Sequence, residues 1–417
     1  MFKSLLQSPQ PLVVDIGNYV VGPYNGSFNV TLSIDFYRVA TLPLEQAPNE
    51  IIPLSKTDES GVSTYFSLPN DESSTEITIP KNSSQVTLEL FASGNGQEEF
   101  WYSNVPNEYT HTFRNWNISF LGQGTYREVM VYIDHEPVGV VWPFEVIFTG
   151  GICPGFWRPI VGHRTFDLPS YTIDLTPYIG FLRHGKHHIS FGINGQPTTL
   201  QNWFVSGHLR IWYGDIRDSS NISPERPFLS NRVSRTADIT TVGLTSDDNT
   251  TFSVTTTATR RDKDYTVNYQ NHQFYRLLDN GSMLLQSLHQ EADFWSPLSS
   301  GYYRLDLRSN ETHNSDDTVG ITATLAQTFE RYTNITMDGL TKEYAELNSS
   351  GRLLIGKERN LSQGNTSILL EFQSGSREYA RDVKAIGFDI VSDYEKDKSI
   401  AREYHGTRGL QFQIPRN

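Results

Sequence analysis

The sequence predicts an all-β protein built from antiparallel jelly-roll or other β-sandwich domains. Aromatic residues make up 12% of the 417 residues, including 21 Tyr and 23 Phe, and such residues favour strands. Apolar residues recur in short alternating runs, as in half-buried strands, rather than at helical spacing. Gly and Pro turn signals separate these runs at intervals of roughly ten residues, which is typical of sandwiches.

The chain is longer than one core usually fills, so we expect more than one domain. Residues 1–45 contain two strand candidates, 13–16 and 28–39. Because a strand pair alone is marginal in water, these are predicted to be remnants of an upstream β domain. Residues 43–75 are rich in Pro, Ser, Asn and Asp and indicate a linker or long loop.

Two further β domains are predicted after this linker. Residues 76–215 alternate like the strands of a jelly roll and contain the candidate site loops. A polar, Pro-containing stretch over 216–235 indicates a boundary. Residues 236–417 are again strand-like, with a hairpin predicted at Asn280-Gly281, where such a pair supplies the positive φ angles of a tight turn. This last domain is expected to be accessory, since seven N-glycosylation sequons start in it.

The formal net charge is −13, spread without a basic stripe, so a nucleic-acid partner is not expected. No apolar run approaches the roughly 18 residues of a membrane-spanning helix, so membrane insertion is not expected. The first residues contain no secretory signal. Cys153, the only cysteine, fits neither a disulfide scaffold nor a zinc site, although an upstream cysteine could pair with it. No metal and no cofactor are expected.

Sequons are dense along the chain. They start at 12 of the 26 asparagines, where Ser and Thr usage would give roughly five by chance. These starts are Asn25, Asn29, Asn82, Asn117, Asn221, Asn249, Asn280, Asn310, Asn334, Asn348, Asn360 and Asn365. The sequons therefore indicate a secreted protein or one of the secretory pathway, and they agree with the missing signal if the N-terminal part lies upstream of this chain.

The segment 98–109, EEFWYSNVPNEY, concentrates carboxylates, aromatic rings and amides around a proline. A loop at the end of a sheet could aim Glu108 and Asn104 into a cleft, while Trp101 and Tyr102 offer flat apolar faces, as in sugar-binding sites. The alternative is a core Trp-Tyr strand followed by a capped turn. Both interpretations stay open from composition alone.

A second candidate is the hairpin 126–149 with the loop that follows it. Arg127 and Glu128 open the first strand, Trp142 stands at the far arm, and Trp157 and Arg158 form another aromatic and cationic loop. The alternative is that the valines are core, that Glu128 and Arg127 form a solvated edge pair, and that Trp157 is a packed corner.

Four blocks resemble the plant and fungal peptide:N-glycanase A family. These are VVDIGNYVVGPYNGSFNVTL at 13–32, FWYSNVPNEY at 100–109, REVMVYID with VGVVWPFEVIFTGGICPGFWRPI at 127–160, and FDLPSYTIDLTPYIG at 166–180. The resemblance extends over nearly the whole chain and is weaker beyond about residue 235. An upstream Phe-Asp-Arg block that the family normally carries is absent here.

The resemblance implies hydrolysis of the amide between asparagine and the innermost N-acetylglucosamine of an N-glycosylated peptide or glycoprotein. Aspartate remains and a glycosylamine departs. Such chemistry needs a base, an acid and oxyanion donors, which carboxylates, Arg and Trp supply without a metal. Glu108 is the leading catalytic candidate, with Glu99 and Glu128 as second choices.

By the same resemblance, the glycan cleft is expected to be lined by aromatic residues and one arginine, namely Trp101, Tyr102, Trp142, Trp157 and Arg158. Two other functions remain open. The chain could be an inactive or glycan-binding remnant of such an enzyme, or a purely structural β protein of the cell surface.

Overall fold

The computed structural model describes most of the chain. The described residues are 47–59, 61–148, 150–196, 198–214, 233–336, 339–356, 361–375 and 377–397, the backbone of 402–406, and six single positions, 9, 22, 25, 26, 29 and 31. The strand candidates at 13–16 and 28–39, and with them the predicted domain of residues 1–45, otherwise lie outside the described residues.

The first half of the described chain forms a sandwich of two antiparallel sheets. In one sheet β9 is central, because β4 pairs along one of its edges and the short β1 and β2 pair in line along the other. The strands of this sheet are β1 (Glu50–Pro53), β2 (Phe66–Leu68), β4 (Ser83–Gly94), β7 (Ser170–Asp174) and β9 (Trp203–Tyr213), and those of the other, in the order β3-β8-β5-β6, are β3 (Ser74–Ile77), β8 (His187–Asn194), β5 (Glu128–Ile133) and β6 (Glu136–Val141).

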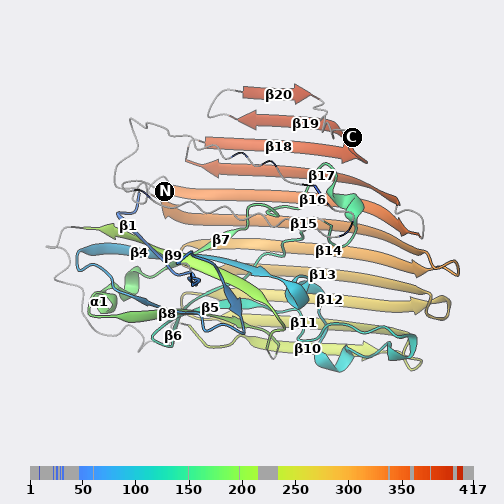
Figure 1. The fold of residues 1–417 in the computed structure, drawn as a ribbon, viewed down its shortest axis with the longest axis horizontal. Coiled ribbons are helices and arrows are strands. Elements are labelled where there is room, and N and C mark those ends of the chain that lie inside the picture. The colour runs from blue at the N-terminus through green and yellow to red at the C-terminus, as the bar shows by residue number, and fades with distance from the viewer. Residues whose placement is uncertain are drawn as a thin grey trace.

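The second half forms one sheet of eleven strands, in which each strand pairs with the next along the chain. Figure 1 shows them following one another in order, with the sandwich lying over one face. They are β10 (Asp238–Thr245), β11 (Thr251–Arg261), β12 (Thr266–Leu278), β13 (Met283–Trp295), β14 (Ser299–His313), β15 (Val319–Thr336), β16 (Gly339–Ile355), β17 (Leu361–Ser374), β18 (Arg377–Ile386), β19 (Asp389–Asp397) and β20 (Arg402–Gly406).

Short helical turns complete the described structure. They are η3 (Gly96–Glu98), η4 (Trp101–Ser103), η5 (Asn107–Tyr109), η6 (Arg114–Trp116), η7 (Pro154–Trp157), η8 (Thr176–Tyr178), α1 (Ile179–Leu182) and η10 (Asp279–Gly281). Among the described residues, no helix has the length and apolar character needed to cross a bilayer.

In the sheet of β3, β8, β5 and β6, most residues of β5 and β6 are buried, and they point to both faces. One face of β5, including Val129 and Val131, packs in the core of the sandwich. On the other face Met130 and Val140 pack against the large sheet in a second cluster with Tyr269 and Phe294. The molecule therefore has three layers, and the large sheet covers a face that would otherwise expose apolar side chains.

The all-β, antiparallel sandwich is confirmed, whereas the jelly-roll topology and the domain boundaries stay predictions. The hairpin at Asn280-Gly281 is confirmed between β12 and β13. Its loop has four residues, and Asp279, Asn280 and Gly281 all have positive φ angles. The predicted linker over 43–75 is wrong, because β1 and β2 lie in it and pair with β9.

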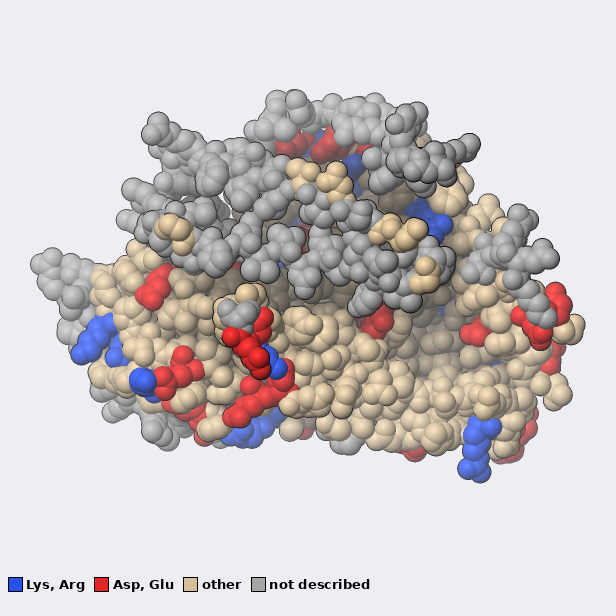
Figure 2. All heavy atoms as spheres, viewed as in Figure 1, with Lys and Arg blue, Asp and Glu red and all other residues tan. Residues whose placement is uncertain are grey.

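Acidic and basic side chains mix on the face of the molecule that carries the sandwich. Figure 2 shows blue Lys and Arg groups beside red Asp and Glu groups, separated by broad neutral areas. Among the described residues no set of three His, Cys, Asp or Glu side chains is arranged to hold a metal ion.

Candidate functional site

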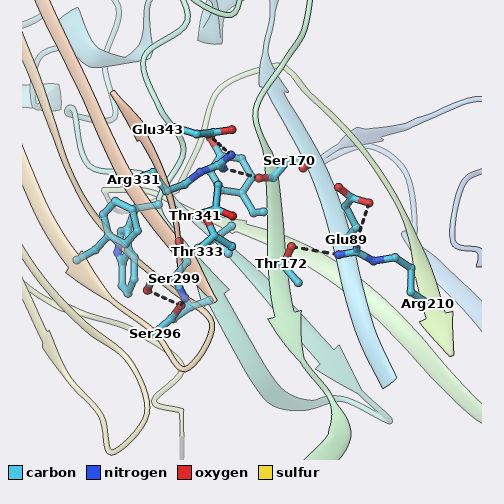
Figure 3. A pocket seen from close by; sticks show the side chains of 15 residues that line it. Glu89, Ser170, Thr172, Arg210, Ser296, Ser299, Arg331, Thr333, Thr341 and Glu343 are labelled. Carbon is cyan, nitrogen blue, oxygen red and sulfur yellow. Dashed lines mark hydrogen bonds and ion pairs between the residues drawn. The ribbon is translucent and has the colours of Figure 1, made fainter. Parts of the chain in front are cut away.

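A cavity of about 230 Å3 lies between the sandwich and the large sheet. Its sandwich wall comes from β4, β6, β7 and β9, and its other wall from the β13–β14 turn, β15 and β16. Val140, Val141, Trp142, Tyr171 and Phe294 give it an apolar surface. Its polar residues are Glu89, Ser170, Thr172, Arg210, Ser296, Ser299, Arg331, Thr333, Thr341 and Glu343, all labelled in Figure 3.

On the sandwich side, Glu89 lies beside a histidine and an arginine. Its Oε2 is 3.0 Å from Nε2 of His208 and 3.6 Å from the guanidinium of Arg210. Burial alone would raise the pKa of Glu89, but the hydrogen bond with His208 and the charge of Arg210 outweigh it and lower the pKa to about 2. Glu89 is therefore ionised at any ordinary pH.

On the sheet side, Glu343 accepts hydrogen bonds from two arginines. Arg331 donates over 2.8 Å and Arg164 over 3.0 Å. Burial opposes ionisation, yet the charges of Arg331 and Arg164 keep the pKa of Glu343 below its ordinary value. The second carboxylate of the cavity is thus also ionised.

Ser170 connects the two groups of charges. Arg331 donates to the carbonyl oxygen of Ser170 over 2.6 Å, and the Ser170 side chain helps to keep the pKa of Glu89 low. In Figure 3, Arg331 and Glu343 point in from the large sheet, and Ser170 lies between them and Glu89. Two carboxylates and two arginines from separate sheets therefore face one space, beside the indole ring of Trp142.

The chemistry of these groups is restricted by their charges. Ionised carboxylates accept hydrogen bonds from hydroxyl and amide groups, and guanidinium groups donate to carbonyl oxygens or to a developing oxyanion. The apolar wall suits the flat face of a sugar ring. At neutral pH neither lining carboxylate carries a proton to donate.

A third carboxyl group, Glu145, is buried near this cavity between the sandwich and the large sheet. Its side chain accepts a hydrogen bond from Gln290 of β13, and its carbonyl oxygen accepts one from Gln327 of β15. Oε2 has no hydrogen-bond partner among the described residues. Burial raises the pKa of Glu145 to about 7. The pKa of Tyr171, which lines the cavity, is raised by burial and, to a smaller extent, by the negative charge of Glu145.

Comparison with known proteins gives a match over the part of the sequence that contains the sandwich. The sequence profile of a family described as "Peptide N-acetyl-beta-D-glucosaminyl asparaginase amidase A" matches residues 1–226, which is more than half of the chain. The chain belongs to this family. The resemblance in the sequence blocks is thereby confirmed.

One curated relative is the "Peptide-N4-(N-acetyl-beta-glucosaminyl)asparagine amidase A" of Prunus dulcis. It is 38% identical over 232 residues, which cover 51% of this chain and 39% of the relative. The chain therefore spans about two fifths of the length of the amidase A relative that it matches. No solved structure matches the chain.

The match to the amidase A family contains only one wall of the cavity. Glu89, Trp142, Ser170 and Arg210 lie within residues 1–226, whereas Arg331 and Glu343 lie beyond them. The site as described thus combines the family region with the large sheet.

The predicted catalytic carboxylates lie apart from each other. Glu108 is exposed in η5, and no hydrogen bond or ion pair joins it to the described residues. Glu99 is half-buried after η3. Glu128 is fully buried and accepts hydrogen bonds from Arg260 of β11, Tyr126 and Asn194. None of the three lines the cavity, so their catalytic role stays a prediction.

The predicted cleft residues are mostly buried. Trp101, Tyr102 and Asn104 lie under the surface, and Asn271 and Gln273 of the large sheet donate to the carbonyl oxygens of this segment. The rings of Trp101 and Tyr102 are buried, as in the alternative of a core Trp-Tyr strand, but they lie in the helical turn η4 rather than in a strand.

The remaining predicted residues follow the hairpin. Trp142 lines the cavity, and its indole N–H donates over 3.0 Å to Tyr126, which in turn donates to Glu128. Trp157 is buried and donates to the carbonyl oxygen of Gly151. Arg158 is exposed over the ring of Phe388. The structure therefore places the predicted residues in separate groups: Trp101 packs against Tyr102, and Trp142 is joined to Glu128 through Tyr126.

Sequence reasoning missed Glu89, Arg210, Arg331 and Glu343. Glu89 and Arg210 stand between apolar neighbours, whereas Arg331 and Glu343 each follow another charged residue, and both patterns also occur on solvated strand faces. Glu145 had a usable signal, because it is a single carboxyl group within the apolar run VVWPFEVIF, where an ionised side chain is costly.

Proposed function

We propose that this protein acts on N-glycosylated peptides as a glycoamidase, hydrolysing the amide between asparagine and the innermost N-acetylglucosamine. Membership of the amidase A family supports the reaction class. The observation that carries the choice of site is the cavity lined by Glu89, Glu343, Arg210 and Arg331 beside Trp142. It combines carboxylates, guanidinium groups and an aromatic face, which suits a sugar joined to an amide.

The size of the cavity limits what it holds. At about 230 Å3 it lies below the roughly 300–1,000 Å3 of sites for drug-sized ligands. It therefore takes the sugar next to asparagine and the amide itself, while the rest of the glycan and the peptide extend outward.

In this proposal the arginines and carboxylates have separate tasks. Arg331 donates to the carbonyl oxygen as it gains negative charge, which stabilises the tetrahedral intermediate. Glu343 holds Arg331 in place and accepts a hydrogen bond from the attacking water. Glu89 accepts hydrogen bonds from sugar hydroxyls, and Trp142 packs against the ring. Glu343 takes a proton from the attacking water and passes it to the nitrogen, which then leaves as the amine of the glycosylamine.

A second candidate function is glycan binding without turnover. The observation that favours it is the ionisation of both lining carboxylates, since the pKa of Glu89 is about 2 and that of Glu343 is lowered. In the free protein neither group therefore carries a proton for the leaving nitrogen. Glycan release and glycopeptide affinity, measured on the same protein, separate the two candidates.

The test compares three variants of the purified protein. Glu343→Gln removes the negative charge of Glu343 from the cavity. Glu346→Gln is the matched control on the same strand, since Glu346 lies on the opposite face and accepts hydrogen bonds from Tyr344 and Asn348. Glu108→Gln tests the exposed carboxylate that the sequence favoured. Thermal unfolding of each variant reports whether it is folded.

Conversion of asparagine to aspartate in a labelled glycopeptide, followed by mass spectrometry, measures release. We expect Glu343→Gln to lower release by on the order of 100-fold, with little change in the other two. If the unaltered chain binds the glycopeptide but releases nothing, and Glu343→Gln weakens binding, the second function holds. Loss in Glu108→Gln with full activity in Glu343→Gln contradicts the choice of the cavity.

A further inference from the structure

The large sheet has a polar groove on the face opposite to the sandwich. The groove has a volume of about 670 Å3. Its floor is made by short side chains of the three strands β15, β16 and β17, such as Thr324, Ala326 and Ser350. Longer side chains form the sides, with Arg304 and Arg308 on β14 and Lys384 on β18.

Two glycosylation sequons meet in this floor. One is Asn348-Ser349-Ser350 on β16 and the other is Asn365-Thr366-Ser367 on β17. The register pairs Asn348 with Ser367, Ser349 with Thr366, and Ser350 with Asn365. The acceptor asparagine of each sequon thus lies opposite the last residue of the other.

Because side chains alternate along a strand, the residues within each sequon point to opposite faces of the sheet. Ser349 and Thr366 are buried toward the sandwich, where their hydroxyl groups are 3.1 Å apart and Thr366 donates to the carbonyl oxygen of Phe156 over 2.6 Å. Asn348 and Asn365 point to the other face and are both exposed. The fold therefore presents both acceptor nitrogen atoms to solvent and anchors the residues between them.

Each acceptor nitrogen remains free to carry a sugar. Asn365 makes no hydrogen bond with the described residues. The side-chain nitrogen of Asn348 donates to Glu346 over 3.0 Å, and it keeps one hydrogen for this bond after it joins a sugar. As diagonal neighbours on adjacent strands, the two asparagines are about 7–8 Å apart, and the short side chains around them leave space above the floor.

We propose that Asn348 and Asn365 are a paired N-glycosylation site and that the first sugars of their glycans lie in this groove. Because N-glycans are bulky and hydrophilic, they cover the solvent face of the large sheet. Substrate then approaches the cavity from the opposite side.

Asn310 gives an internal comparison on the same face. It starts a sequon on β14, but its side-chain oxygen is buried without a partner among the described residues. Asn310 is half-buried, whereas both asparagines of the pair are exposed. The proposal therefore expects lower occupancy at Asn310 than at the pair.

Tryptic peptides from protein secreted by a eukaryotic host test the modification. Asn348 lies in the peptide 343–352, Asn365 in 360–377 together with Asn360, and Asn310 in 309–331. We expect glycans on most copies of the first two sites and on few copies of Asn310. Recovery of the 343–352 peptide mostly without a glycan, or an Asn365 that is mostly unmodified beside a modified Asn360, overturns the paired site. A glycan occupancy at Asn310 equal to that at Asn348 and Asn365 contradicts the inference that exposure of the asparagine decides its occupancy.

A second measurement tests the position of the glycans. An added endoglycosidase that cuts between the first two sugars is applied to native and to denatured protein. Glycans whose first sugars lie in the groove are released at least about 10-fold more slowly from the native protein, since the enzyme has to reach that bond. Equal rates at Asn348 and Asn365 in the two states overturn the groove contact. Asn249, on an exposed turn with a positive φ angle, is the reference site for free release.

Discussion

Replacement of Glu145 by glutamine is expected to make the protein more stable at alkaline pH. Burial raises the pKa of this carboxyl group from an ordinary value of 4.5 to about 7 in the folded protein. The folded state therefore holds a proton that the unfolded state releases between these two values. The contribution of protonated Glu145 to the unfolding free energy is therefore complete below about pH 4.5 and is lost as the pH rises through 7.

The size of the effect follows from the two pKa values. At about 1.4 kcal/mol per pH unit, the difference corresponds to about 3 kcal/mol of unfolding free energy. Glutamine has the shape of the protonated acid, cannot ionise, and still accepts the hydrogen bond from Gln290. The variant should match the unaltered protein near pH 4 and exceed it by up to about 3 kcal/mol near pH 8.

Urea unfolding, followed by tryptophan fluorescence at the two pH values, measures this difference. Comparing variant with unaltered protein at each pH removes the contribution of all other titrating groups. Glu108→Gln controls for the loss of a negative charge at the surface. The reasoning is refuted if Glu145→Gln gives the same difference in unfolding free energy at both pH values.

Three further changes test the packing of the layers and the electrostatics of the cavity. Arg260→Met leaves Glu128 buried without its cation and should lower the unfolding free energy by about 3–5 kcal/mol; a loss below about 1 kcal/mol in urea unfolding contradicts the buried pair. Gly155→Ala places a methyl group 2.6 Å from the carbonyl oxygen of Gln363 on β17, and the overpacking of about 1–3 kcal/mol should appear as a lower unfolding temperature. Gly320→Ala, whose methyl group meets no atoms and which has no positive φ angle, is the control and should leave the unfolding temperature nearly unchanged. Glu89→Gln removes a carboxylate whose pKa of about 2 lies below the ordinary 4.5. The variant should therefore be less stable than the unaltered protein above pH 4.5, and this difference should shrink as the pH falls through 2. Acid unfolding that is unchanged in the variant refutes the pairing of Glu89 with His208 and Arg210.

Strands and hairpins could be predicted because they follow local rules. Alternation of apolar residues and the Asn280-Gly281 turn depend on neighbours in sequence, and the structure confirms both. The short β1 and β2 were missed because their segment is dominated by turn-forming residues. Their strand structure comes from pairing with β9, which is more than a hundred residues away.

The pair Arg127 and Glu128 shows why the candidate site was harder to predict. From sequence, two adjacent opposite charges fit a solvated edge pair. In the structure both are buried on opposite sides of their sheet. Arg127 pairs with Glu98 at 2.6 Å toward the sandwich core, and Glu128 pairs with Arg260 toward the large sheet. Adjacent strand residues face opposite ways, so each charge needed a distant partner that local patterns do not reveal.

The polar contacts between sandwich and large sheet explain how a cavity persists in a largely apolar interface. Apolar burial is not directional, so by itself it would tolerate small shifts of one layer over the other. Glu128 with Arg260, Arg331 with Ser170, and the two glutamines on Glu145 each require one register. Breaking such buried contacts is costly, and the walls of the cavity are therefore held at a fixed separation by residues outside it.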